Sequence, residues 1–123
     1  MTVPPPESLR RVLLVEDEVM VAMYVEDVLT ELGCSVVGLG TNLSQALAHA
    51  QNAEFDFAVL DINLGGEVSF PVADILRQRK IPFLFISGYT SAGIADEYRN
   101  ELRLRKPFRT AELARAISRL HPT

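Results

Sequence analysis

The sequence predicts an α/β domain in which five parallel strands form a doubly wound sheet flanked by five helices. The chain has 123 residues, which is the size of one domain. Short runs of apolar residues alternate along it with stretches in which apolar residues recur at helical spacing. Such runs are typical of parallel strands buried on both faces, and the spaced residues are typical of amphipathic helices. Right-handed crossovers between the strands would then cover both faces of the sheet with helices.

The strands are predicted from short apolar segments. Residues 12–15 are apolar without interruption, and residues 83–86 repeat this pattern directly after Pro82. Residues 102–104 alternate between Leu and Arg, which is typical of a strand at the edge of a sheet. The predicted strands cover residues 12–15, 34–39, 55–60, 83–86 and 102–104.

The helices are predicted from apolar residues spaced three or four positions apart. Gly33 follows the first of these segments, at a place where a glycine commonly ends a helix. Thr41 or Asn42 is a candidate N-cap for the second segment, and Thr110 for the last one. The predicted helices cover residues 21–32, 43–50, 70–80, 91–100 and 110–120.

The composition is that of a folded domain and excludes several classes of protein. The formal net charge is −4, which argues against nucleic-acid binding because that function needs clustered cations. No apolar run is long enough to cross a membrane, so we expect no membrane segment. Cys34 is the only cysteine, which excludes an intramolecular disulfide and a cysteine-rich zinc site and fits a cytoplasmic location.

Residues 1–9 are expected to form an extended, proline-rich arm ahead of the domain. They include three consecutive prolines, which favour an extended backbone, and they lack the basic start and apolar stretch of a signal peptide. No internal repeat and no second composition zone follows this arm. We therefore expect the folded domain to cover residues 10–121.

Polar residues stand where the predicted strands end. Because the carboxyl ends of parallel strands meet at one edge of a sheet, these side chains are expected to converge there. Glu18 is expected to support the start of the following helix, where a carboxylate interacts favourably with the helix dipole. The residues at the strand ends are Glu16, Asp17, Glu18, Asp61, Asn63, Ser87 and Lys106.

Carboxylates gathered at this edge need a cation. If Glu16, Asp17 and Asp61 converge to about 5 Å, each ionised pair repels by roughly 3 kcal/mol at an effective dielectric constant of about 20. One Mg²⁺ together with Lys106 would balance their three negative charges. A phosphoryl group fits the same site, since the metal, Lys106 and Ser87 would spread the charge of its oxygens. Asp61 is the central candidate for a nucleophile that forms an aspartyl phosphate.

This arrangement resembles the response-regulator receiver domains of two-component signalling, which are CheY-like. The order and the spacing of the matching segments both fit, and the resemblance covers about residues 10–120. The resemblance implies a flavodoxin-like fold with strand order 2-1-3-4-5. The matching segments are Val15-Glu16-Asp17-Glu18, Leu60-Asp61-Ile62-Asn63, Ser87 and Lys106-Pro107-Phe108.

The resemblance also implies the roles of the acidic residues. Asp61 would accept a phosphoryl group. Glu16 and Asp17 would hold Mg²⁺, with Asp17 the more direct ligand. Asp61 and the backbone carbonyl of Asn63 would complete the protein ligands of the metal.

The remaining site residues would act on the phosphoryl group. The resemblance implies that Ser87, in place of the commoner Thr, donates a hydrogen bond to it and that Lys106 pairs with it. The peptide bond between Lys106 and Pro107 is usually cis in this family. The domain would then be no enzyme toward other molecules, since it catalyses only its own phosphorylation and dephosphorylation.

A narrower resemblance is to the "FAT GUY" receivers. It is carried by Pro-Phe-Leu-Phe-Ile-Ser-Gly-Tyr at residues 82–89 and by Asp-Ile-Asn-Leu-Gly-Gly-Glu at residues 61–67. The resemblance implies a histidine kinase as partner, including kinases of the HWE type, or a histidine phosphotransfer protein. It also implies a role in the general stress response and an effector that the sequence does not identify.

The sequence departs from the receiver pattern at two places. Most receivers carry an aromatic switch residue three positions before the lysine, where this chain has Arg103. Tyr89 is therefore predicted to be the residue that moves on phosphorylation. The usual Met-Pro after the third strand is missing, and Gly65 and Gly66 are expected to make that loop more flexible.

Alternative functions stay open at this point. The domain could act as a phosphate sink that drains a shared kinase, or as a kinase inhibitor that works without phosphorylation of Asp61. A flavodoxin-like module for a small molecule is disfavoured, because acidic residues stand after the first strand where a phosphate-binding loop would lie. A monomer or a weak dimer is expected.

Overall fold

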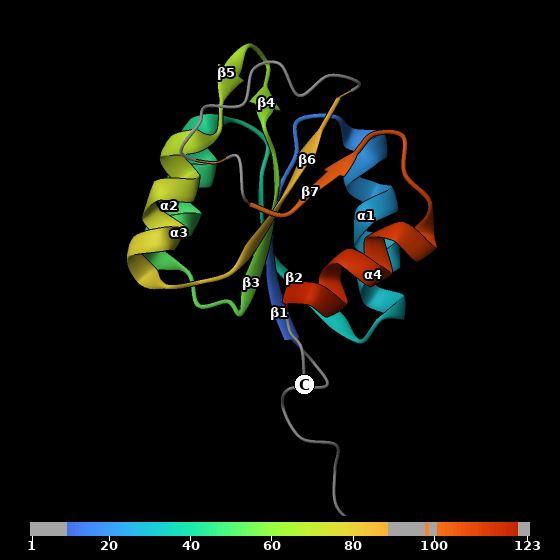
Figure 1. The fold of residues 1–123 in the computed structure, drawn as a ribbon. Coiled ribbons are helices and arrows are strands. Elements are labelled where there is room, and N and C mark those ends of the chain that lie inside the picture. The colour runs from blue at the N-terminus through green and yellow to red at the C-terminus, as the bar shows by residue number, and fades with distance from the viewer. Residues whose placement is uncertain (1–9, 89–97, 99–100, 121–123) are drawn as a thin grey trace, which may run out of the picture.

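The computed structural model describes residues 10–88, 98 and 101–120. Its centre is a parallel five-stranded sheet of order β2-β1-β3-β6-β7 (Figure 1). Numbered along the chain within this sheet, that order is the expected 2-1-3-4-5. The strands are β1 (Arg10–Val15), β2 (Cys34–Gly40), β3 (Phe57–Asp61), β6 (Phe83–Ser87) and β7 (Arg103–Arg105).

Helices cover both faces of this sheet, as expected for a doubly wound fold. Helices α1 (Val19–Glu31) and α4 (Thr110–Leu120) lie on one face. Helices α2 (Leu43–Asn52) and α3 (Phe70–Arg79) lie on the other (Figure 1). The described residues contain four of the five predicted helices, and the segment predicted at 91–100 lies outside them except for Tyr98.

The continuous apolar runs are explained by burial on both faces. Successive side chains of a strand point to opposite faces of the sheet. In β1, Val12 and Leu14 pack into the cluster beneath α1 and α4, whereas Leu13 and Val15 pack into the cluster beneath α2 and α3. Both faces of the strand therefore need apolar residues. Cys34 is buried in the first of these clusters.

Local signals at the ends of α1 and α2 are confirmed. Gly33 follows α1 with a φ of 84°, a left-handed conformation that a glycine adopts without steric cost. Asn42 caps α2, because its side-chain oxygen accepts a hydrogen bond from the backbone N–H of Gln45. No helix among the described residues is both long and apolar enough to span a membrane.

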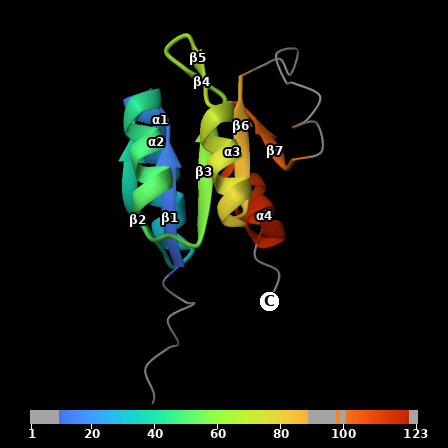
Figure 2. The ribbon, with the colours of Figure 1, turned by 90° about the vertical axis from the view of Figure 1, so that its left-hand side faces the viewer.

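A short hairpin follows β3 and was not predicted. Strands β4 (Asn63–Leu64) and β5 (Glu67–Val68) pair antiparallel through a turn at Gly65 and Gly66. Both glycines have positive φ, 60° and 96°, and the Asn63 side chain accepts a hydrogen bond of 2.9 Å from the N–H of Gly66. The two glycines form the turn of this hairpin, and the flexibility expected of this segment stays a prediction. Figure 2 shows the hairpin projecting beyond the carboxyl ends of the central strands.

Tyr98 fills the core between β6 and α3. Its ring is stacked on Phe70 at 4.5 Å between centroids and meets Phe85 edge-on at 5.9 Å. Its hydroxyl donates hydrogen bonds to the backbone oxygen of Phe70 and to the carboxylate of Asp74. The guanidinium of Arg77 lies 4.4 Å from the ring centroid. Tyr98, which lies between β6 and β7 in the sequence, is 1% exposed and is therefore part of the hydrophobic core.

Two substitutions at Tyr98 separate its hydroxyl from its ring. Tyr98→Phe removes only the hydrogen bonds and is expected to lower the free energy of unfolding by about 1 kcal/mol. Tyr98→Ala also leaves a cavity and is expected to lower it by about 3–5 kcal/mol. Urea denaturation followed by circular dichroism measures both. An alanine variant as stable as the wild type would contradict this packing.

Candidate functional site

The residues predicted at the strand ends meet at one edge of the sheet. Glu16, Asp17 and Glu18 follow β1, and Asp61 and Ser87 are the last residues of β3 and β6. The pairing of β3 with β6 brings Asp61 and Ser87 together, because Asp61 pairs with Ile86, the residue before Ser87. Lys106 follows β7, and its backbone N–H donates a hydrogen bond of 2.7 Å to the carbonyl of Ser87.

The ammonium group of Lys106 is the centre of this cluster. Its Nζ lies 3.1 Å from Asp61 Oδ2, 3.1 Å from Glu18 Oε1, and 3.1 Å and 3.3 Å from the two oxygens of Glu16. Burial alone would lower the pKa of Lys106, but the hydrogen bond to Glu18 and the charge of Asp61 outweigh it and raise that pKa above its usual value. Lys106 is therefore positively charged.

Glu18 has a partner that the sequence did not predict. Glu18 stands at the N-cap of α1, but its side chain makes no capping hydrogen bond. Its carboxylate binds Lys106 instead, although 63% of the side chain is exposed. The sequence alone did not show this contact, because Glu18 and Lys106 are brought together only by the tertiary fold.

Glu16 is buried and is held close to a second carboxylate. Burial and a hydrogen bond to the Asp61 side chain raise the pKa of Glu16 to about 7, although the backbone N–H of Glu18 opposes this by donating to Oε2. Glu16 Oε1 is buried and accepts no hydrogen bond, and its partner is the Lys106 ammonium 3.1 Å away. A buried carboxylate oxygen in this setting is stabilised by a neighbouring cation, either the ammonium or a metal ion.

The four acidic side chains fit a divalent metal. Glu16, Asp17, Glu18 and Asp61 each offer a carboxylate oxygen, and these atoms lie within 4.8 Å of one another. Four carboxylates against the single ammonium of Lys106 leave an excess of negative charge. Oxygen ligands of this kind suit Mg²⁺, and the buried Glu16 Oε1, which accepts no hydrogen bond, is the observation that fits a further cation here.

The other residues that the sequence singled out differ in burial and in distance from the acidic cluster. Ser87 is buried at the edge of the cluster. Asn63 donates its backbone N–H to Asp61 Oδ1 at 3.2 Å, and its side chain is used within the hairpin turn. Arg103 is exposed on the edge strand β7, where most receivers carry the aromatic residue. Tyr89 lies outside the described residues. The Lys106–Pro107 peptide bond is cis, as the resemblance implied.

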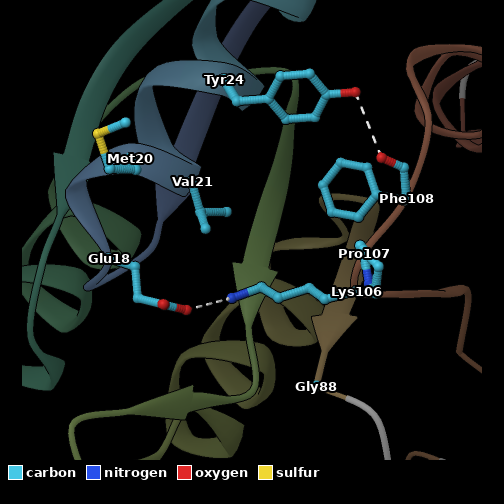
Figure 3. A pocket seen from close by; sticks show the side chains of 8 residues that line it. All are labelled: Glu18, Met20, Val21, Tyr24, Gly88, Lys106, Pro107 and Phe108. Carbon is cyan, nitrogen blue, oxygen red and sulfur yellow. Dashed lines mark hydrogen bonds and ion pairs between the residues drawn. The ribbon is translucent and has the colours of Figure 1, made fainter.

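An apolar groove that the sequence analysis missed opens beside Lys106. Its volume is about 470 Å³, and it runs between the start of α1 and the segment that follows β7 (Figure 3). The Tyr24 hydroxyl closes one end by donating to the backbone oxygen of Phe108 at 3.4 Å. Met20 is 78% exposed. The groove is lined by Glu18, Met20, Val21, Tyr24, Gly88, Lys106, Pro107 and Phe108.

The raised pKa of Glu16 predicts a dependence of stability on pH. The folded chain keeps this proton up to about pH 7, whereas the unfolded chain releases it near the ordinary pKa of a glutamate, 4.5. Protonation of Glu16 therefore raises the free energy of unfolding at low pH, and this stabilisation is lost as pH rises through 7. We expect Glu16 to contribute a loss of about 2–3 kcal/mol in the free energy of unfolding between roughly pH 5 and pH 8.

Urea denaturation in the presence of EDTA measures this effect when the wild type is compared with Glu16→Gln. The amide does not titrate, so the stability difference between the two proteins should change with pH by the amount stated. A difference that stays constant over this range would show that Glu16 has an ordinary pKa.

Comparisons with known proteins identify the family. The model of the response regulator receiver domain matches residues 12–118. The chain is 30% identical to the phyllosphere-induced regulator PhyR of Methylorubrum extorquens over 111 residues, 87% of this chain and 42% of that protein. The chain spans about half the length of the curated relatives it matches.

Solved structures agree with this assignment. The solution structure of SdrG from Sphingomonas melonis Fr1 is 39% identical, with a TM-score of 0.82, over 92% of this chain and 97% of that chain. The REC domain of the response regulator PhyR from Erythrobacter litoralis is 27% identical, with a TM-score of 0.82, over 94% of this chain and 92% of that chain. The protein therefore belongs to the response regulator receiver domain family.

Proposed function

We propose that this domain accepts a phosphoryl group on Asp61 from a histidine kinase, with Mg²⁺ bound, and then changes the partner that it binds. The observation that carries the proposal is the position of Asp61. Its side chain is 6% exposed at the end of the central strand β3, with Oδ2 3.1 Å from Lys106 Nζ. It stands within the cluster of four carboxylates that fits a divalent cation.

The transfer needs a carboxylate held in place. Asp61 Oδ1 accepts the N–H of Asn63, and Oδ2 accepts from Lys106. One of these oxygens attacks the phosphorus of a phosphohistidine, the P–N bond breaks, and the electron pair leaves with the imidazole, which takes up a proton from water. The product is an acyl phosphate on Asp61 and an unmodified histidine.

The remaining residues stabilise the charge of the transferring group. Lys106 is placed to donate to a phosphoryl oxygen, and the Ser87 hydroxyl is the second donor at this edge of the sheet. Glu16, Asp17, Asp61 and the backbone carbonyl of Asn63 would hold Mg²⁺. When bound, the metal neutralises part of the negative charge of the carboxylates and of the phosphoryl oxygens.

The groove beside Lys106 supports docking of the phosphoryl donor there. Its lining is mostly apolar and includes the exposed side chain of Met20. It also ends at Lys106, whose ammonium contacts Asp61. A donor seated in the groove would therefore reach Asp61.

The relatives support the signalling context. Among solved structures similar to this chain is one described as the PhyR stress response regulator, 27% identical over 91% of this chain. We propose a cytoplasmic role in the general stress response, with a kinase of the HWE type or a histidine phosphotransfer protein as donor. The effector stays unnamed. A phosphate sink would use the same reaction, whereas a kinase inhibitor that needs no phosphorylation would still bind the kinase after Asp61→Asn.

Intact mass spectrometry tests the proposed reaction. The protein is incubated with acetyl phosphate, with and without Mg²⁺. We expect the wild type to gain one phosphoryl group only when Mg²⁺ is present, and Asp61→Asn to gain none. Asp27→Asn is a suitable control because Asp27 is exposed on α1 and lies outside the acidic cluster.

Two outcomes would contradict the proposal. Phosphorylation of Asp61→Asn at the wild-type rate would place the acceptor elsewhere. A wild-type protein that gains no phosphoryl group at saturating Mg²⁺ would exclude the phosphorelay and the sink together. Binding of the kinase would then be measured without phosphate.

A further inference from the structure

Lys106 has as many carboxylate partners as it has protons to donate. An ammonium group carries three N–H donors and no acceptor. Three carboxylates accept from this one: Glu18 Oε1 and Asp61 Oδ2 at 3.1 Å each, and Glu16 Oε2 at 3.3 Å. No N–H of Lys106 is left over for a further oxygen.

A phosphoryl group on Asp61 adds a further acceptor for the three N–H donors of Lys106. If Lys106 is to donate to a phosphoryl oxygen, one of its three contacts must break. When Asp61 Oδ1 is the nucleophile, Oδ2 becomes the carbonyl oxygen of the acyl phosphate and can still accept from Lys106. The Glu16 side chain is 1% exposed, so its carboxylate gains little hydration when its contact with Lys106 is lost. The Glu18 side chain is 63% exposed, and its carboxylate can return to water at small cost.

We propose that Glu18 is a positioning residue that occupies one N–H of Lys106 in the unphosphorylated protein and gives it up to the phosphoryl oxygen, and so slows phosphorylation. This inference rests on the proposed function of Asp61. Figure 3 shows the contact directly, with the Glu18 carboxylate extending from the start of α1 to Lys106 along one side of the groove.

The reaction with a small donor makes the step explicit. An oxygen of Asp61 attacks the phosphorus of acetyl phosphate, the bond from phosphorus to the acetyl oxygen breaks, and acetate leaves with the electron pair. The Lys106 N–H that pointed to Glu18 turns to a phosphoryl oxygen. No proton is transferred, because Lys106 remains an ammonium group before and after the step.

The Glu18→Gln variant tests this role. The neutral amide binds the ammonium more weakly than a carboxylate does. We expect Glu18→Gln to be phosphorylated about two- to five-fold faster than the wild type by acetyl phosphate at saturating Mg²⁺, which corresponds to the loss of one exposed ion pair. Glu67→Gln is the matched control, because Glu67 is an exposed carboxylate on the hairpin at the same edge of the sheet and lies outside the acidic cluster. It should react within about 1.5-fold of the wild type.

A second measurement does not depend on phosphorylation. The NMR signal of the Lys106 ammonium, recorded without a phosphoryl donor, should shift in Glu18→Gln and stay in place in Glu67→Gln. A variant whose fold is merely disturbed would shift signals throughout the domain instead.

The outcomes separate this inference from the proposed function. If the wild type is phosphorylated and Glu18→Gln reacts at the same rate or more slowly, Glu18 does not slow the step and the inference is overturned. An equal acceleration in Glu67→Gln would assign the effect to net charge and would also overturn it. If the wild type takes up no phosphoryl group, the proposed function fails and this inference fails with it.

Discussion

The site depends on one ion-pair centre, the ammonium of Lys106 among three carboxylates. Each carboxylate comes from a different place: Glu16 from the end of β1, Glu18 from the start of α1, and Asp61 from the end of β3. Without Lys106, Glu16 would be a buried charge beside a second carboxylate, an arrangement that proteins avoid by protonation or by metal binding. Lys106 therefore offsets part of the negative charge of the acidic cluster, but one ammonium group does not neutralise four carboxylates.

The fold brings this centre together from distant parts of the chain. Parallel pairing places the ends of β1, β3, β6 and β7 at one edge, so residues separated by up to 90 positions come into contact. The edge strand β7 is only three residues long, yet the N–H of Lys106 continues the pairing by donating to the carbonyl of Ser87. Tyr98 fixes the chain before β7 by packing between Phe70 and Phe85.

The sequence predicted the sheet and the members of the site because both follow from simple patterns. Strands buried on both faces must be apolar throughout, and polar residues that follow them must gather at one edge. The hairpin at 63–68 was missed because strands of two residues are too short to show a period. The contact of Glu18 with Lys106 and the burial of Tyr98 depend on tertiary packing, which has no periodic signal in the sequence.

We propose that the acidic cluster binds a divalent cation in addition to Lys106. Calorimetric titration with Mg²⁺ tests it most directly, since it needs neither a kinase nor a phosphoryl donor. We expect the wild type to bind one Mg²⁺, and Asp17→Asn to lose most of that affinity while Asp27→Asn keeps it. Absence of binding at millimolar Mg²⁺, or equal affinity in Asp17→Asn, would contradict the account.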